Sequence, residues 1–390
     1  MNARPAAPTA SLTVQLGWAV YLACSWTWCI GMYLPIVLRD HYGWPGVIAF
    51  ALPNIAGVVL FGIAVGTASI SRALIARHGG VMAWFSLITI AFHVYFLAAV
   101  WGYEREGASW VAGLLVPVPI VALAWLARPL CDQTLRRLAL FVYATSLAML
   151  GASAVIHLSD STEAASRTAV WAERAPSGVV FLAPLFALGF LTCPSMDLTF
   201  HRALEGVGGE RAGRTTFALF SALFAVMIAS TALYSVTGLR WPVIVHILIQ
   251  SWFTMTLHWR EIDCHGGGES LRAARRWLRP VLLVSLLLAP LPFVDYRWWF
   301  IFTGLVFPAY VMLMMARSRL GRPAASEWTL AVVILALAPF AALGFLGGYE
   351  WLLLVPCIAL VISLFIGERG GAPMDQMRPG LAPAPLSPTG

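Results

Sequence analysis

The sequence predicts an all-α polytopic membrane protein, and three observations support this fold class. Of the 390 residues, 60% are hydrophobic and 11% are charged, with a mean hydropathy of +0.80, which excludes an ordinary water-soluble globular domain. Apolar runs of about twenty residues recur along the chain, and each is long enough to cross a hydrocarbon core as a helix. Arginines gather in alternate loops between these runs, as expected of a chain that crosses a membrane many times.

The apolar runs predict about twelve transmembrane helices, and ten is the lower bound because several runs are short. In chain order the predicted spans are 11–38, 44–65, 81–101, 108–127, 138–156, 179–204, 215–236, 241–257, 277–293, 298–315, 328–345 and 351–366. Many of them begin at a tryptophan, a residue that anchors helices at the membrane interface.

The arginines also predict the sidedness of the chain. All 25 basic residues are arginine, and with both termini in the cytoplasm about 19 lie inside and about 6 outside, as the positive-inside rule requires. We therefore expect residues 1–10 to form a cytoplasmic amino terminus. The net charge of +7 reflects this topology and contact with anionic lipid, so no nucleic-acid partner is expected. The absence of lysine, with abundant alanine and arginine, suggests a GC-rich bacterial genome and hence the inner (plasma) membrane.

The cysteines and the carboxyl end contribute no further domain. The six cysteines are scattered without a CxxC pair, so neither a disulfide framework nor a zinc site is expected. Residues 371–390 are rich in proline and are predicted to be a disordered tail. No cofactor is expected apart from a coupling ion, Na⁺ or H⁺.

Two of the predicted spans carry residues that interrupt a helix near its middle. The first contains "SWTWCIGMYLP" from Ser25, and the sixth contains Cys193, Pro194 and Ser195 followed by Asp197. Proline removes a backbone donor, whereas serine and aspartate are residues that cap helices. Both interruptions begin about fourteen residues after the span starts, which predicts two discontinuous helices.

The two interruptions are about 165 residues apart, and a shift of this size lays spans two to five on spans seven to ten. Five spans reverse the sidedness, so the sequence predicts a 5+5 inverted repeat of residues 11–156 and 179–315, with two additional helices over 328–366. Interrupted helices at matching positions of inverted halves indicate a secondary transporter with its site near the membrane midplane.

This architecture resembles the LeuT-type fold of the amino acid-polyamine-organocation superfamily, which the sodium-solute symporters share. The resemblance covers about residues 11–315 and rests on the repeat and the two breaks. It implies that helices one and six unwind around a small organic solute at residues 26–31 and 193–197, and that helices one and eight share a sodium ion near Ser251 and Thr254. The adjacent pair of hydroxyl residues common in that eighth helix is missing here, which puts sodium coupling in question.

Polar residues within the spans complete the predicted site. Asp197 is the only acidic residue near the centre of a span, and His246, Gln250, Thr254 and His258 recur every four residues on one helix face, with His258 expected in cytoplasmic water. The candidate solute-binding residues are Trp26, Trp28, Cys29, Gly31, Asn54, Cys193, Pro194, Ser195, Asp197, His246 and Gln250. The candidate sodium ligands are Gly31, Asp197, Ser251 and Thr254.

Structural roles compete with each of these assignments. Asp197 could cap the second half of its helix or pair with His201 or Arg202 one turn later. The tryptophans could serve aromatic packing, Asn54 could bind backbone groups freed by Pro53, and the stripe on the eighth span could serve hydrogen bonding between helices. His93 and His157 are expected to be structural histidines.

Two other functions remain open at this stage. A carrier of the major facilitator type has the same span count, although its repeat would fall at half the chain and the loop after its second span usually carries an acid that is missing here. A membrane-embedded lipid-modifying enzyme could use Asp197, His201 and Arg202 near the cytoplasmic interface. We expect a transporter rather than an enzyme, with a small-molecule solute and membrane lipids as partners and an undetermined oligomeric state.

Overall fold

The computed structural model describes residues 10–104, 109–159, 178–232, 240–264, 269–288 and 297–366, and this part of the chain forms helices and no strand. Residues 1–9 of the predicted amino-terminal segment and the whole predicted tail 371–390 lie outside the described residues. Among the described residues, eight helices are long and apolar enough to cross a membrane: Cys29–Ala64, Ala68–Gly102, Trp110–Ala127, Asp132–His157, Val179–Met196, Glu210–Ala232, Trp298–Arg319 and Glu327–Leu346. The chain is therefore an all-α, membrane-embedded protein, while the count of twelve spans and the inverted repeat stay predictions.

The helices follow one another with short connections. The first group comprises α1 (Leu12–Trp26), α2 (Cys29–Ala64), α3 (Ala68–Ala99), η1 (Val100–Glu104), α4 (Trp110–Leu115), α5 (Pro117–Ala127) and α6 (Asp132–Ser159). The second comprises α8 (Val179–Thr192), η2 (Cys193–Met196), α9 (Leu198–Val207), α10 (Glu210–Ala232), α12 (Trp241–Cys264) and α13 (Glu269–Leu288). The last comprises α14 (Trp298–Ile301), η3 (Phe302–Val306), α15 (Phe307–Tyr310), η4 (Val311–Ala316), α16 (Arg317–Arg319), α17 (Glu327–Leu346), η5 (Glu350–Leu353) and α18 (Leu354–Ser363).

Local chemistry accounts for several helix ends. Ser11, Thr67, Ser109 and Ser326 each precede a helix, and each side chain accepts a hydrogen bond from a backbone N–H of the first turn. Gly43 divides α2, because its φ of 65° and ψ of −164° lie outside the helical region. This bend separates the second half of the predicted first span from the predicted second span.

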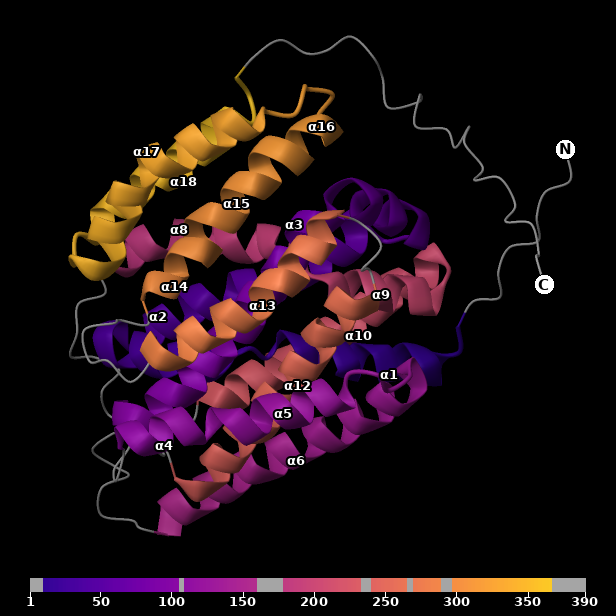
Figure 1. Cartoon of the computed structure of the whole chain (residues 1–390), viewed down its shortest axis with the longest axis vertical. Coiled ribbons are helices and arrows are strands. Elements are labelled where there is room, and N and C mark those ends of the chain that lie inside the picture. Colours follow the sequence, from indigo (N-terminus) through magenta and orange to yellow (C-terminus); the bar gives the residue numbers. More distant parts are fainter. Residues whose placement is uncertain are drawn as a thin grey trace, which may run out of the picture.

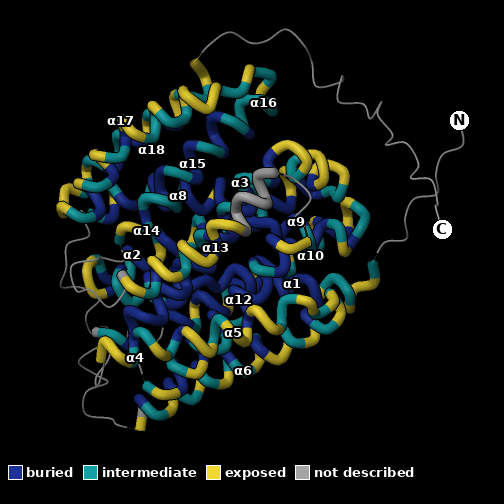
Figure 2. Tube along the Cα trace, viewed as in Figure 1, coloured by how far each residue is buried: buried dark blue, intermediate teal, exposed yellow. Residues whose placement is uncertain are grey.

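Other helices enclose most of α1. It packs against α6, α9, α10 and α12, and every residue from Gly17 to Trp26 is buried. In Figure 1 α1 lies on the right and α2 on the left, with α12 beside α1 and with α6 and α17 at opposite edges. Figure 2 shows the same division, with a buried centre and exposed residues on the outer helices.

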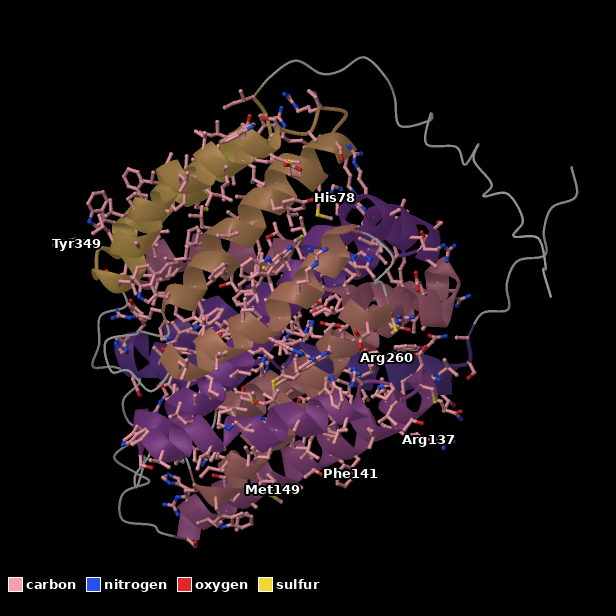
Figure 3. All side chains as sticks on the ribbon, in the orientation of Figure 1. His78, Arg137, Phe141, Met149, Arg260 and Tyr349 are labelled. Carbon is pink, nitrogen blue, oxygen red and sulfur yellow. The ribbon has the colours of Figure 1, made fainter. Side chains whose placement is uncertain are left out.

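The outer helices present one face to the surroundings. On α6 the buried positions Leu135, Ala139, Val142, Ser146 and Leu150 recur every three or four residues. On the opposite face lie Arg137, Phe141 and Met149, and Phe141 is 61% exposed (Figure 3). Apart from Arg137 near the start of α6, this outward face is apolar, as a lipid-facing helix requires.

Glycines allow the inner helices to approach one another closely. A Cβ atom at Gly57 of α2 would overlap the carbonyl oxygen of Phe190 in α8, and one at Gly189 would lie 2.6 Å from the carbonyl oxygen of Thr303 in η3. Small residues at helix contacts are typical of membrane proteins, because packing replaces the hydrophobic effect there. These contacts hold α8 between α2 and η3.

Candidate functional site

The first interruption lies at Thr27 and Trp28. The backbone leaves helical geometry at Thr27 (φ −76°, ψ 67°) and Trp28 (φ −68°, ψ 169°), between the end of α1 and the start of α2. Thr27 folds back on the preceding turn, because its Oγ1 donates to the carbonyl of Ala23 at 2.7 Å. The predicted break in the first span is present. Gly31 lies one turn later, inside regular helix, where its Cα faces the Ile228 side chain of α10.

The second interruption lies between α8 and α9. The chain tightens into the 3₁₀ helix η2 over Cys193–Met196 and then extends at Asp197 (φ −85°, ψ 110°) before α9 begins. Pro194 opens this 3₁₀ turn, where its missing N–H costs nothing. The Cys193 Sγ lies 3.9 Å from the carbonyl oxygen of Thr303, which belongs to the π-helical segment η3. The predicted break in the sixth span is therefore present too.

Asp197 caps α9, as the structural interpretation of the sequence expected. Its Oδ1 accepts from the backbone N–H of Thr199 at 2.8 Å and from the Thr199 hydroxyl at 2.7 Å. The side chain is fully buried. Neither His201 nor Arg202 is its partner in these contacts.

The two interruptions meet through hydroxyl groups. Ser25, the residue before Trp26 at the end of α1, has its Oγ 2.9 Å from Oγ1 of Thr199. Because the Thr199 hydroxyl proton is used on Asp197, its oxygen accepts the proton of Ser25. A chain of hydrogen bonds thus runs from Ser25 through Thr199 to Asp197 and joins both broken helices.

The polar stripe on α12 faces the interior. His246, Gln250, Thr254 and His258 are all fully buried, and Ser251 beside them is buried as well. Gln250 donates to Ser146 Oγ of α6 at 3.0 Å, and Thr254 donates to the carbonyl of Cys24 in α1 at 3.2 Å. The expectation that His258 lies in cytoplasmic water is wrong, because α12 continues to Cys264 and packs against α1, α3 and α9 around this residue.

His258 approaches Asp197 from α12. Its Nδ1 lies 3.1 Å from Oγ of Ser86 in α3, and its Nε2 lies 3.9 Å from Oδ2 of Asp197. Within the described part of the chain, neither that Nε2 nor that Oδ2 has a hydrogen-bond partner, and both are buried. The same holds for Nε1 of Trp28, whose ring lies 5.9 Å from the His258 ring between centroids. We call Ser25, Trp28, Ser86, Asp197, Thr199 and His258 the polar cluster.

His93 of α3 supports the first break from the other side. The N–H of Cys29, the first residue of α2, donates to His93 Nε2 at 3.3 Å, and His93 Nδ1 lies 2.8 Å from the carbonyl oxygen of Thr89. Since a carbonyl only accepts and an N–H only donates, the His93 proton is assigned to Nδ1. His93 therefore has the structural role expected of it, as the acceptor for an N–H that the broken helix leaves free.

Aromatic side chains fill the space around the breaks. Trp26 packs on Trp28 and on Phe200, each at 4.8 Å between ring centroids, and Trp28 also packs on Phe85. The Trp26 indole N–H donates to Oδ1 of Asn54 at 2.6 Å, so this asparagine binds a side chain of the first break.

An ion-pair network closes one end of this core. Arg202 of α9 donates to both carboxylate oxygens of Glu261 at 3.1 to 3.3 Å, and Arg260 reaches Asp132 of α6 at 2.5 Å and Glu261 at 3.7 Å. Glu261 is fully buried and lies almost one turn beyond His258 on α12. Figure 3 shows Arg260, which lies near the end of α12, on the side of the molecule where α1 begins. Asp132, Arg202, Arg260 and Glu261 are called the ion-pair network below.

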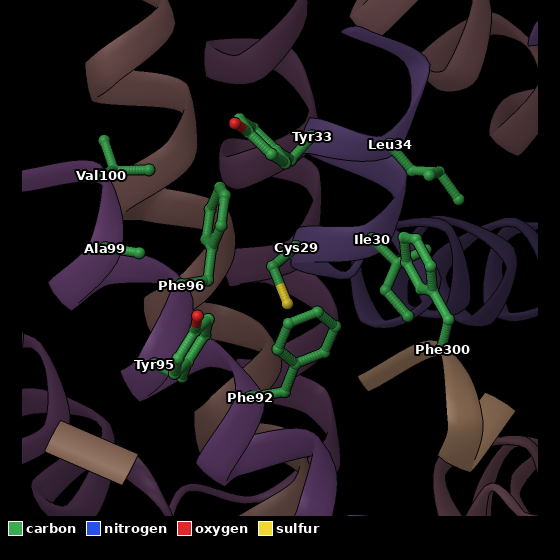
Figure 4. Close-up of a pocket in the computed structure, with 10 residues that line it drawn as sticks. All are labelled: Cys29, Ile30, Tyr33, Leu34, Phe92, Tyr95, Phe96, Ala99, Val100 and Phe300. Carbon is green, nitrogen blue, oxygen red and sulfur yellow. The ribbon is translucent and has the colours of Figure 1, made fainter. Parts of the chain in front are cut away.

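A narrow apolar pocket lies on the other side of the first break. Its lining residues are Cys29, Ile30, Tyr33, Leu34, Phe92, Tyr95, Phe96, Ala99, Val100 and Phe300. Figure 4 shows Cys29 and Ile30 from the start of α2 facing the aromatic rings of α3 and Phe300 of α14. A second pocket shares Ile30, Leu34 and Phe300 and extends toward Phe190 and Thr303. Both pockets therefore border the start of α2, just after the first break. The second pocket also borders α8, just before the second break.

No protein-family model matches the chain, and no curated protein matches it.

Several predicted site residues converge, and others do not. Asp197 and Thr254 lie against α1 near its break, through Ser25 and Cys24, whereas Gln250 bonds to α6 and Gly31 faces α10. Ser251 Oγ has no hydrogen-bond partner among the described residues. Within the same residues, no group of three or more His, Cys, Asp and Glu side chains could hold a metal ion.

The residues of the enzyme alternative point in different directions. His201 places Nδ1 at 2.9 Å from Ser71 Oγ and Nε2 at 3.1 Å from the Ser195 carbonyl oxygen. Arg202 faces Glu261. Asp197 instead shares its surroundings with His258, so the three residues do not converge on one reacting group.

Sequence reasoning missed Ser25, Ser86 and Thr199. Single hydroxyl residues within apolar spans are common, and their partners lie about 170 residues away in the chain for Ser25–Thr199 and His258–Ser86. The position of Thr199 two residues after a capping aspartate is the one local signal that pointed to it.

Proposed function

We propose that this protein is a secondary active transporter that moves a small organic solute by alternating access, with its site between the interrupted helices α1–α2 and α8–α9. The observation that carries the proposal is the contact between the two breaks through Ser25, Thr199 and Asp197. Broken helices in a membrane interior leave backbone groups free to bind a solute or an ion, and they are tolerated only where protein or a cavity surrounds them.

The two sides of the breaks differ in a way that supports this function. On one side the ion-pair network joins α6, α9 and α12, and on the other the apolar pockets reach Cys29 and Thr303. Alternating access opens a fixed site to one side of the membrane at a time, as one part of the bundle moves against the other. We assign the network side to the cytoplasm, because the predicted cytoplasmic arginines Arg128 and Arg136 flank it in sequence.

The resemblance of the sequence to the LeuT-type fold supports the same proposal. The resemblance implies that helices one, six and eight surround the site, and the corresponding helices α1, α9 and α12 pack against one another here. Inner (plasma) membrane location and ion coupling are parts of the same proposal.

The test begins with ligand binding to the purified protein. Thermal unfolding is measured against a panel of amino acids, sugars, nucleobases and organic amines, because a ligand that binds only the folded state stabilises it by mass action, by about 2.7 kcal/mol at a hundred times its Kd. The best stabiliser is then assayed for uptake into proteoliposomes under imposed Na⁺ and H⁺ gradients.

Asp197→Asn and Asp263→Asn form a matched pair for this assay. The same chemical change is made in the buried cluster and at the exposed surface pair with Arg128. We expect gradient-driven uptake that Asp197→Asn abolishes and Asp263→Asn leaves unchanged. Uptake that is absent under either gradient, from a protein that binds the same compound, would overturn the transporter assignment.

A further inference from the structure

The geometry of the polar cluster bears on the identity of the coupling ion. Asp197 offers one oxygen, Oδ2, that the helix cap does not use, and the group facing it is Nε2 of His258 at 3.9 Å. Both atoms are buried and lack a hydrogen-bond partner within the described residues. Buried polar atoms are nearly always bonded, so two such atoms facing each other indicate a site that something else completes.

We propose that Asp197 and His258 form a proton-binding pair that carries the coupling proton. The coupling role of the proton rests on the proposed function, whereas the existence of the proton site rests on the geometry alone. A proton from the aqueous phase binds Nε2 of neutral His258, and the resulting imidazolium donates Nε2–H to Oδ2 of Asp197 and Nδ1–H to Oγ of Ser86. Release of the same proton restores the neutral imidazole.

The partners of His258 suit a positive charge. The hydroxyl oxygen of Ser86 accepts as readily as it donates, and the carboxylate of Asp197 only accepts, so both ring nitrogens can donate at once. The protonated pair is neutral overall, which lowers the cost of holding it away from water. His93 differs, because the Cys29 N–H occupies its Nε2 lone pair, and protonation there would leave two donors facing each other.

Most of the other titratable or charged groups around the pair already have partners among the described residues. From α2, α3, η2, α9 and α12 these groups are Cys29, His93, Cys193, His201, Arg202 and Glu261. Cys193 contacts the Thr303 carbonyl, His201 contacts Ser71 and the Ser195 carbonyl, and Arg202 pairs with Glu261.

The same geometry favours a proton over a sodium ion. Hard cations are held by several oxygen ligands, whereas the group that faces Oδ2 is an imidazole nitrogen. The hydroxyl oxygens of Ser25 and Thr199 are bonded to each other, and the Thr254 hydroxyl is bonded to the Cys24 carbonyl.

Proton binding at this pair would act on both broken helices. A charge-assisted hydrogen bond is shorter than the present separation, about 2.7 to 2.9 Å, so protonation draws His258 of α12 toward Asp197. Asp197 is linked to α1 through Thr199 and Ser25, and α12 is linked to α1 through Thr254 and Cys24. The proton therefore changes how α9, α12 and the end of α1 pack at the site.

The test is a pH titration by nitrogen-15 NMR of protein labelled at its eight histidines and reconstituted in lipid. The expected result is that one buried imidazole titrates and that its signal is missing in His258→Gln. In Asp197→Asn that signal should titrate about 1 to 3 pH units lower, because the imidazolium loses its opposite charge. Asp263→Asn is the control, and His41→Gln identifies the signal of an exposed histidine.

Two results would overturn the inference. One is a His258 signal that does not titrate while the protein stays folded, or titrates identically in Asp197→Asn. The other is a buried titrating signal that disappears in His201→Gln instead. The Thr89-bonded His93 signal and the thermal stability report folding in every variant, so loss of structure is recognised separately.

Failure of this inference and failure of the transporter proposal are distinguishable. Solute uptake that follows a Na⁺ gradient and ignores a pH gradient removes the proton role and keeps the transporter. A titrating Asp197–His258 pair in a protein that moves no solute keeps the proton site and removes the transporter.

Discussion

Ser25 Oγ and Thr199 Oγ1 lie 2.9 Å apart and form a direct hydrogen bond between the two interrupted helices. Both side chains are fully buried, and Thr199 passes the contact on to Asp197. A pair of hydroxyl groups at this point can form and break hydrogen bonds with little change in volume, which suits the relative movement of the two halves that the proposed function requires.

Thr199→Val should lower the free energy of unfolding by about 1 to 3 kcal/mol, because it leaves Ser25 Oγ buried without its acceptor and takes one donor from Asp197. Thr199→Ser keeps the hydroxyl and should recover most of that loss. The measurement is unfolding in mixed micelles. Thr215→Val, where the hydroxyl bonds only to its own helix at Arg211, is the control and should change stability by less than about 0.5 kcal/mol. Equal losses at Thr199 and Thr215 would contradict the role given to this contact.

His93→Ala should destabilise the protein by about 3 kcal/mol, since it removes the acceptor of the Cys29 N–H and leaves a cavity in α3. Hydrogen–deuterium exchange of the peptide that contains Cys29 should become faster than in the wild type. His93→Gln can still accept a hydrogen bond and should exchange at an intermediate rate. Unchanged exchange in His93→Ala would show that the amide is protected by other means.

Glu261→Gln should open the end closed by the ion-pair network, because Arg202 and Arg260 lose the buried charge between them. The readout is maleimide modification of Cys24, a fully buried thiol near the first break, in a variant whose other cysteines are serine. We expect modification to accelerate about tenfold, which corresponds to about 1.4 kcal/mol in the opening equilibrium. Glu210→Gln breaks an exposed pair with Arg214 and should leave the rate unchanged, since exposed pairs contribute little. The same acceleration in both variants would argue that the ion-pair network does not close this end of the protein.

Gly57→Ala and Gly151→Ala should differ in their effect on stability although both glycines lie within helices. A methyl group at Gly57 would overlap the Phe190 carbonyl of α8 and should cost about 1 to 3 kcal/mol through overpacking. Gly151 of α6 has nothing within 4 Å of the position of a Cβ, so alanine there should be neutral or stabilising by up to about 1 kcal/mol. Unfolding in mixed micelles measures both. A loss at Gly151 as large as that at Gly57 would mean that α6 makes a contact there that this chain alone does not show.

Cys131 provides a test of the predicted sidedness. It lies in the exposed turn between α5 and α6, and hydrogen bonds from Thr134 lower the pKa of its thiol, so more thiolate is present at a given pH than for an ordinary cysteine. In a Cys264→Ser background, a membrane-impermeant maleimide should label Cys131 in inverted vesicles and not in intact cells. Thr134→Ala should raise the pKa and slow the labelling at neutral pH. Labelling from the cell exterior would reverse the predicted topology.

The sequence by itself determined the class of the protein and the places where two helices break. A mean hydropathy of +0.80 and apolar runs of span length leave a helical membrane protein as the fold class, because backbone groups in lipid must bond within their own segment. The break at Thr27–Trp28 lies in the segment where the sequence predicted one. The break at Cys193–Asp197 is a local event, because Pro194 lies at the start of the 3₁₀ turn and Asp197 caps α9. Asp197 as a helix cap was predictable for the same reason.

The tertiary structure alone decided which polar groups meet. The periodicity of α12 placed His246, Gln250, Thr254 and His258 on one face. It did not indicate which helices these side chains contact: Gln250 bonds to α6, Thr254 bonds to α1, and His258 lies against α3 and Asp197. The hydrogen-bond partners of Gln250, Thr254 and His258 lie more than a hundred residues away along the chain. Such a hydrogen bond depends on how the helices pack and not on the neighbouring residues in the sequence. For that reason the sequence placed His258 in water, whereas packing of α12 against α1, α3 and α9 buried it beside the one carboxylate at the break.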